Sequence, residues 1–207
     1  MEAQKKRAKK SDLTKRVFLI ISLKMCLIFL VLSFFFVFYG LDSAALSFFS
    51  GIKSHWPDAL FGIMTNFGFA VIAMFFLPAF LFLRDKQKTR AEALIAALAA
   101  SIILSFFIKL IFARIRPADF SSFFFYYSFP SLHAVVSFSA LPLIMDNYKY
   151  PLVKLFFIIV AVLVAVSRLY FSYHFLSDVV FVAVFGWFIG YYILLIFKNG
   201  AKSGKKV

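Results

Sequence analysis

Long apolar stretches separated by short polar segments make up most of the chain. A helix needs about 20 apolar residues to cross a lipid bilayer. Six stretches reach or approach that length, at residues 17–39, 59–83, 91–112, 132–145, 152–169 and 179–197. The pattern predicts an all-α polytopic membrane protein, in which a six-transmembrane-helix bundle over residues 17–198 lies between two basic tails, 1–16 and 199–207.

Basic residues are distributed unevenly between the two sides of this predicted bundle. The segments on the side of the termini contain 17 of the 23 lysines and arginines, and the opposite side contains five. Cytoplasmic loops carry an excess of basic residues, so both termini are expected in the cytoplasm. Because the chain is 63% hydrophobic, we attribute its net charge of +14 to contacts with membrane lipids and expect no nucleic acid as a partner.

Three short segments place polar residues at the ends of predicted helices. They cover residues 109–117, 130–133 and 167–178, and the predicted topology brings all three to the outer, non-cytoplasmic face. Ionisable groups at membrane depth are costly and usually mark function. Lys109, Arg116 and Arg168 supply three cations, a suitable set for binding a phosphoryl group.

The same segments contain groups suited to nucleophilic attack on phosphorus. His174 and Asp178 are four residues apart and would share a helical face. We expect Asp178 to hold one ring N–H, which leaves the other nitrogen free to attack, and His133 to protonate the leaving alkoxide. Ser131 is expected to cap a helix whose free amides, beginning near Leu132, bind an anion.

Oxygen ligands for a metal ion are scarce in this set of residues. Asp178 is committed to His174, and Asp119 stands alone in the sequence. A magnesium site would need several oxygen ligands. We therefore predict metal-independent chemistry without a cofactor, in which the cations take the place of a metal.

These segments resemble the type 2 phosphatidic acid phosphatase (PAP2) superfamily, whose signature is K-x6-RP, PSGH and SR-x5-H-x3-D. Ten positions match it in order and spacing: Lys109, Arg116, Pro117, Pro130, Ser131, His133, Ser167, Arg168, His174 and Asp178. The resemblance implies a six-helix phosphatase with His174 as nucleophile and His133 as general acid. It also implies phosphate binding by a further set of residues, namely Lys109, Arg116, Ser131 and Arg168. Leu132 replaces the glycine of the family; it keeps the backbone amide, and would be strained only if its φ were positive.

The resemblance favours an integral membrane lipid phosphatase of the bacterial inner membrane, with its active site facing the periplasm and no obligate protein partner. The candidate substrates are lipid A, undecaprenyl diphosphate, phosphatidylglycerol phosphate and phosphatidic acid. Small size, high basicity and short loops are most similar to bacterial lipid A 1-phosphatases. A lipid phosphotransferase remains open, whereas a channel would not need a His–Asp pair beside three cations.

Three further features of the sequence lie outside the ten matched positions. Arg114 lies outside the signature and would either contact a headgroup or face water. The aromatic stretch 120–129 is typical of an interfacial belt and would also form an apolar lip for acyl chains. His55, in the expected first outer loop, is interpreted as structural.

Overall fold

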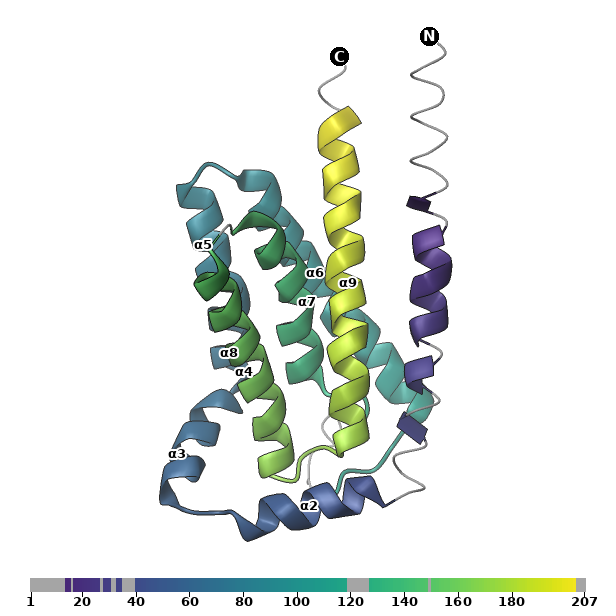
Figure 1. Cartoon of the computed structure of the whole chain (residues 1–207), viewed down its shortest axis with the longest axis vertical. Helices are drawn as coiled ribbons and strands as arrows, with labels where there is room; N and C mark the ends of the chain where they lie inside the picture. Colours follow the sequence, from purple (N-terminus) through teal and green to yellow (C-terminus); the bar gives the residue numbers. More distant parts are fainter. Residues whose placement is uncertain are drawn as a thin grey trace.

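The computed structural model describes residues 14–15, 17–26, 28–30, 33–34, 40–118, 127–148 and 150–203 (Figure 1). Its named elements are α2 (Leu41–Gly51), α3 (His55–Met64), α4 (Phe67–Val71), the π-helical segment η1 (Ile72–Phe76), α5 (Leu77–Arg84), α6 (Lys88–Phe112), α7 (Leu132–Asn147), α8 (Pro151–Tyr170) and α9 (Leu176–Ser203). Within these described ranges an isolated bridge between Ile115 and Tyr127 is present and no strand is formed. The all-α prediction is therefore confirmed.

Four helical stretches are long and apolar enough to cross a membrane: Phe67–Arg84, Lys88–Phe112, Pro151–Tyr170 and Leu176–Asn199. Val17–Leu30 and Leu132–Asn147 are apolar but shorter. These helices support a multi-pass membrane protein. The count of six spans, the cytoplasmic location of the termini and the domain limits stay predictions, and residues 1–13 and 204–207 of the tails lie outside the described residues.

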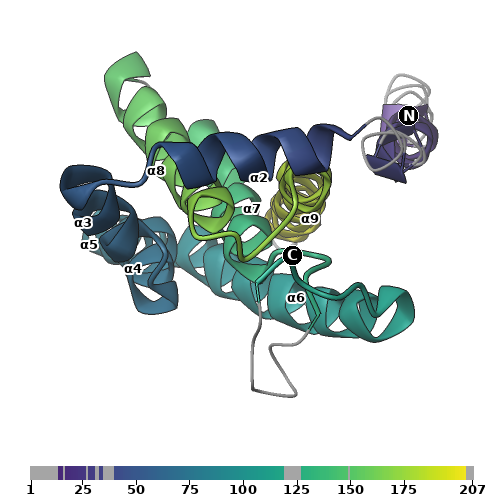
Figure 2. The same ribbon diagram turned by 90° about the horizontal axis from the view of Figure 1, so that it is seen from below.

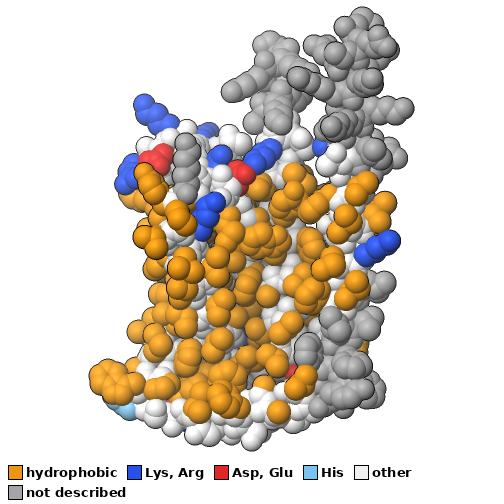
Figure 3. All heavy atoms as spheres, viewed as in Figure 1, with side chains coloured by type: hydrophobic (Ala, Val, Ile, Leu, Met, Phe, Trp, Pro, Cys, Tyr) orange, Lys and Arg blue, Asp and Glu red, His pale blue; other side chains and the backbone are white. Residues whose placement is uncertain are grey.

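The surface of the bundle has the character expected of a protein surrounded by lipid. Large apolar side chains point outward along it; Ile111 on α6 is 75% exposed and Leu152 on α8 is 78% exposed. On the face shown in Figure 3, hydrophobic side chains cover the flank, and most lysines and arginines lie toward the end that carries the loop between α5 and α6. Such a belt would be unfavourable in water and is stable where acyl chains cover it.

Two parts of the fold differ from the sequence prediction. Residues 41–51, expected within an outer loop, form α2, which lies across the ends of α8 and α9 (Figures 1 and 2). The predicted helix 59–83 is broken, because α3 ends at Met64 with Thr65 as its C-cap, and Asn66 caps α4 by accepting from the Phe69 amide at 3.3 Å. A hydropathy pattern detects neither feature, since α2 is too short to span a bilayer and the break leaves the apolar run intact.

Helix α7 lies between its neighbours at the centre of the bundle and packs most closely on α9. Gly186 and Gly190, one turn apart on α9, face the backbone of α7. A Cβ atom at these positions would lie 2.6 Å from the Val135 carbonyl oxygen and 1.9 Å from the Ser139 carbonyl oxygen. Glycine at this spacing lets two helix backbones approach each other within a membrane. The contact holds the N-terminal half of α7 against the middle of α9.

Candidate active site

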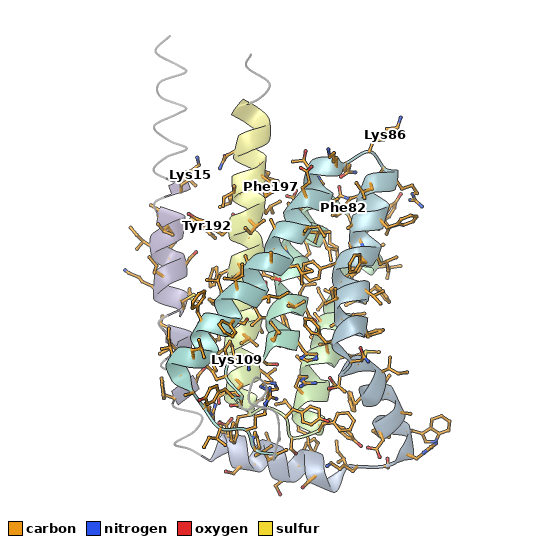
Figure 4. All side chains as sticks on the ribbon, turned by 180° about the vertical axis from the view of Figure 1, so that it is seen from behind. Lys15, Phe82, Lys86, Lys109, Tyr192 and Phe197 are labelled. Carbon is orange, nitrogen blue, oxygen red and sulfur yellow. The ribbon has the colours of Figure 1, made fainter. Side chains whose placement is uncertain are left out.

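The site residues selected from the sequence lie at the end of the bundle opposite the loop between α5 and α6. They are Lys109 in the last turn of α6, Arg116 in the connection that follows, Ser131, Leu132 and His133 at the start of α7, Arg168 in the last turn of α8, His174 between α8 and α9, and Asp178 in the first turn of α9. Figure 4 shows Lys109 toward that end and Lys86 at the other. Three segments distant in sequence therefore meet on one side of the protein.

His174 is buried between a carboxylate and a guanidinium. Its Nε2 atom lies 3.1 Å from Nη1 of Arg116, and its Nδ1 atom lies 3.7 Å from Oδ2 of Asp178. The second distance is too long for a hydrogen bond, so the expected bond from the ring N–H to Asp178 is absent although the two groups face each other. The arrangement leaves Nε2 on the side of the cations and Nδ1 on the side of the carboxylate.

The connection before α9, rather than a shared helical face, brings His174 next to Asp178. His174 precedes the helix, which begins at Leu176, so the helical argument from their spacing is wrong. Instead Oδ2 of Asp178 accepts from the backbone N–H of Phe175 at 3.0 Å. This is the acidic half of a capping box, in which a first-turn carboxylate satisfies the amide at the helix start. The same bond turns the carboxylate back toward the imidazole.

The surroundings of His174 favour its neutral form. Burial, followed by the charges of Arg168, Arg116 and Lys109, holds the pKa of His174 well below its ordinary value of 6.5. An unprotonated nitrogen has the free electron pair that attack on phosphorus requires. Burial also lowers the pKa of Arg116, to about 10, so this guanidinium is still charged at neutral pH.

Backbone carbonyl groups orient each of the three cations. The bonds run from Lys109 Nζ to the Tyr127 oxygen at 2.7 Å, from Arg116 Nη1 to the Tyr173 oxygen at 2.9 Å, and from Arg168 Nη1 to the Thr65 oxygen at 3.1 Å. Arg168 also donates to the hydroxyl group of Thr65. A carbonyl oxygen fixes a cation without cancelling its charge. For Lys109 and Arg168 the positive charge therefore remains available for an anion.

The start of α7 presents Ser131 and His133 to the same region. Ser131 occupies the N-cap position with an extended backbone, but its side chain does not cap the helix, so that expectation is wrong. Its buried hydroxyl has no hydrogen-bond partner among the described residues. Leu132 is the first helical residue and lacks a positive φ, so replacing the family glycine causes no strain. His133 stacks edge-on against Phe67, with ring centroids 5.1 Å apart.

Comparison with known proteins agrees with this arrangement. Residues 90–202 match the sequence model of the PAP2 superfamily. The chain belongs to the PAP2 superfamily. All eight predicted site residues fall inside the matched region, and α2 lies outside it.

Two crystal structures share the PAP2 fold of this chain. One is a transmembrane PAP2 type phosphatidylglycerolphosphate phosphatase from Bacillus subtilis, with a TM-score of 0.70 and 20% identity over 86% of this chain and 96% of that one. The other is LpxE of Aquifex aeolicus, with a TM-score of 0.63 and 22% identity over 75% of this chain and 95% of that one. At these identities the likeness establishes the fold alone. No curated protein matches the chain.

The structure adds residues that the PAP2 signature does not contain. Arg114, for which the sequence left a headgroup contact or a water-facing position open, donates to Asp178 at 2.6 Å and to Asp42 at 2.7 Å. Thr65, at the break between α3 and α4, holds Arg168. The position of Arg114 between the matched residues Lys109 and Arg116 was a weak signal. Asp42 lies in a helix that was not predicted, and Thr65 lies where the predicted helix 59–83 is broken.

Some predicted features are only partly covered, or lie away from the PAP2 site. Residues 119–126, which include Asp119 and most of the aromatic stretch 120–129, lie outside the described residues. Phe129 is buried and packs edge-on against Phe112, with ring centroids 4.9 Å apart. His55 begins α3 and is exposed beside Trp56, and its structural interpretation stays a prediction.

Proposed function

We propose that this PAP2 protein is an integral membrane phosphatase that hydrolyses a lipid phosphate monoester or diphosphate through a phosphohistidine intermediate. The observation that carries the proposal is the setting of His174, whose Nε2 atom faces Arg116 at 3.1 Å while Nδ1 faces Asp178. A neutral imidazole beside a cluster of cations is suited to attack a phosphoryl group that those cations hold.

The reaction would proceed in two steps. In the first, Nε2 of His174 forms a bond to phosphorus, the bond from phosphorus to the lipid oxygen breaks, and His133 gives its proton to the departing oxygen. In the second, water attacks the phosphohistidine, His133 takes a proton from that water, and phosphate leaves with His174 restored. Lys109, Arg116 and Arg168 stabilise the charge on the phosphoryl oxygens in both steps.

The proposed chemistry needs neither a metal ion nor a cofactor. Among the described residues no group of three His, Cys, Asp or Glu side chains lies close enough to hold a metal ion. The three cations supply the charge stabilisation that a metal would otherwise give. Activity is therefore expected to persist in EDTA, and loss of activity that added magnesium restores would contradict this part of the proposal.

The excess of basic residues on the side of the termini supports a site that faces the periplasm, in a protein of the bacterial inner membrane. Lipid A 1-phosphate is the first substrate we propose, because the small size, basicity and short loops of the chain resemble those phosphatases. Phosphatidylglycerol phosphate is the second, since the phosphatase with that substrate has the higher TM-score and coverage of the two structures. Undecaprenyl diphosphate is a further alternative.

A phosphate-release assay on purified protein tests these proposals. The panel comprises lipid A, undecaprenyl diphosphate, phosphatidylglycerol phosphate and phosphatidic acid, each in mixed micelles, with His174→Ala as the inactive control. Release from one or more lipids by the wild type alone is expected. Transfer of phosphate to a lipid hydroxyl without free phosphate would identify a phosphotransferase, and inactivity on all four lipids would refute the proposal.

A further inference from the structure

A chain of buried ionic contacts lies behind His174, on the side away from the cations. Nη1 of Arg114 donates to Oδ1 of Asp178 at 2.6 Å, and Nη2 of Arg114 donates to Oδ2 of Asp42 at 2.7 Å. The side chain of Asp178 is fully buried and that of Asp42 is 6% exposed. The guanidinium carbon of Arg114 also lies 4.0 Å from the ring centroid of Phe175. One arginine is thus shared by two carboxylates that have almost no contact with solvent.

Ser177 closes this chain of contacts from α9. Its backbone N–H donates to Oδ1 of Asp42 at 2.9 Å, and its hydroxyl donates to Oδ2 of Asp42 at 2.8 Å. The same hydroxyl accepts from Nη1 of Arg114 at 2.7 Å. These bonds join α2, the connection after α6 and the first turn of α9, which carries Asp178. The position of the Asp178 carboxylate therefore depends on side chains from two other segments.

The charges of the three ionic groups explain why a second carboxylate is present. Arg114 alone would neutralise Asp178 and weaken its ability to stabilise positive charge on His174. Asp42 offsets that effect, because two carboxylates and one guanidinium leave one net negative charge. Positive charge develops on the imidazole when Nε2 bonds to phosphorus, and a nearby negative charge lowers the energy of that state.

We infer that Arg114 and Asp42 are positioning residues, which orient Asp178 toward His174 and keep its negative charge effective during attack. The inference rests on the proposed function, since it assigns these residues to the phosphohistidine step. Neither residue belongs to the signature motifs. Both lie behind the imidazole, so neither is expected to touch the substrate.

The simplest alternative is that the contacts only fasten α2 to the bundle. A second attachment of the same outer region offers a matched control. The hydroxyl of Tyr170 on α8 donates to Oδ1 of Asp58 on α3 and accepts from the backbone N–H of Ser54 at 3.3 Å. Asp58 is exposed, and among the described residues no hydrogen bond or ion pair links it to His174 or Asp178. Asp42→Asn and Asp58→Asn therefore make the same chemical change in two contacts of the outer helices. The contact of Asp42 continues through Arg114 to Asp178, which lies beside His174.

Steady-state kinetics on the preferred lipid separates the two interpretations. We expect Asp42→Asn to lower kcat by about tenfold or more, the effect of losing one charged hydrogen bond, with KM within about twofold of wild type. Asp58→Asn should keep both constants. A wild-type kcat for Asp42→Asn, or a rise in KM alone, would overturn the inference. Arg114→Lys keeps the charge but cannot contact Asp42 and Asp178 in the same way, so it is expected to show the same loss in kcat. It replaces Asp42→Asn in this test if that variant does not fold.

A measurement that does not depend on enzymatic turnover tests this inference independently of the proposed function. The chain has three histidines, so ¹⁵N-histidine NMR with His174→Asn for assignment can follow the ring nitrogens of His174. The groups that face this ring are Lys109, Arg116, His133, Arg168 and Asp178. Asp42→Asn should change the distribution of the proton between Nδ1 and Nε2, and Asp58→Asn should not. Unchanged shifts in Asp42→Asn would refute the positioning role, whereas a wild type inactive on every lipid would refute the phosphatase.

Discussion

The close contact between α7 and α9 makes Gly190→Ala a quantitative test of the fold. The added Cβ would lie 1.9 Å from the Ser139 carbonyl oxygen, where ordinary contact begins at 3.4 Å. The helices would have to separate by roughly 1.5 Å, because the obstacle is backbone and cannot rotate away. Overpacking costs about 1–3 kcal/mol, and the better helix propensity of alanine returns up to about 1 kcal/mol. We expect a net loss of about 2 kcal/mol.

The separation should also disturb the active site. Helix α7 carries Ser131 and His133, and α9 carries Asp178, so a shift between these helices changes distances among catalytic groups. A misplacement of about 1 Å can cost on the order of 100-fold in rate. Thermal unfolding in detergent micelles should show a midpoint lower by about 4–8 °C. The phosphate-release assay should show the larger relative loss.

Two other glycines supply the controls for this experiment. At Gly186 the new Cβ would lie 2.6 Å from the Val135 carbonyl oxygen, so Gly186→Ala should be harmful but milder than Gly190→Ala. At Gly62 on α3 nothing lies within 4 Å, and Gly62→Ala should keep or slightly raise the midpoint. A Gly190→Ala variant with wild-type midpoint and rate, or one no worse than Gly62→Ala, would show that α7 and α9 do not pack in this way.

Further expectations concern the catalytic groups. His174→Ala should abolish turnover and the acid-labile phosphoenzyme; retention of a tenth of the wild-type rate would refute its role as nucleophile. Asp178→Asn should lower kcat far more than it raises KM, and the reverse pattern in steady-state kinetics would contradict an orienting role. Orthovanadate should raise the unfolding midpoint, because an anion relieves repulsion among Lys109, Arg116 and Arg168, and Arg168→Ala should diminish this shift. Because the pKa of His174 is held below 6.5, the unfolded chain binds a proton that the folded protein does not. The wild type should thus lose stability as pH falls through 6.5, and a His174→Asn variant measured between about pH 7.5 and 5.5 should lose less.

The sequence predicted the apolar helices because a membrane imposes a minimum length and composition on each span. The start of α7 at Leu132 and the spans ending at Phe112 and Tyr170 agree with the prediction within two residues. Segments near the membrane surface are not constrained in this way. Helix α2 is short and mixed in polarity, and the break at Thr65 leaves the hydropathy unchanged. A prediction that relies on the length of apolar runs therefore misses both features.

The site was predictable to the extent that its groups lie in fixed motifs. Spacing and topology correctly gathered Lys109, Arg116, Arg168 and His174 at one end of the bundle. The carbonyl groups that orient the cations were not predictable, because backbone acceptors have no signature in sequence. Asp42 is a similar case, since it lies in a helix that the pattern did not reveal and meets Arg114 only in the folded protein.

The bonds between Asp42 and Ser177 also bear on how the protein is made. The two residues are 135 positions apart, and Ser177 lies in the first turn of the last named helix. During synthesis the chain emerges from the ribosome with its N-terminus first, so the bond from Ser177 to Asp42 and the bond from Arg114 to Asp178 can form only after the start of α9 has been made. Nascent chains that lack α9 should therefore be devoid of enzymatic activity, and α2 can form its bonds to α9 only after Ser177 has been added to the chain.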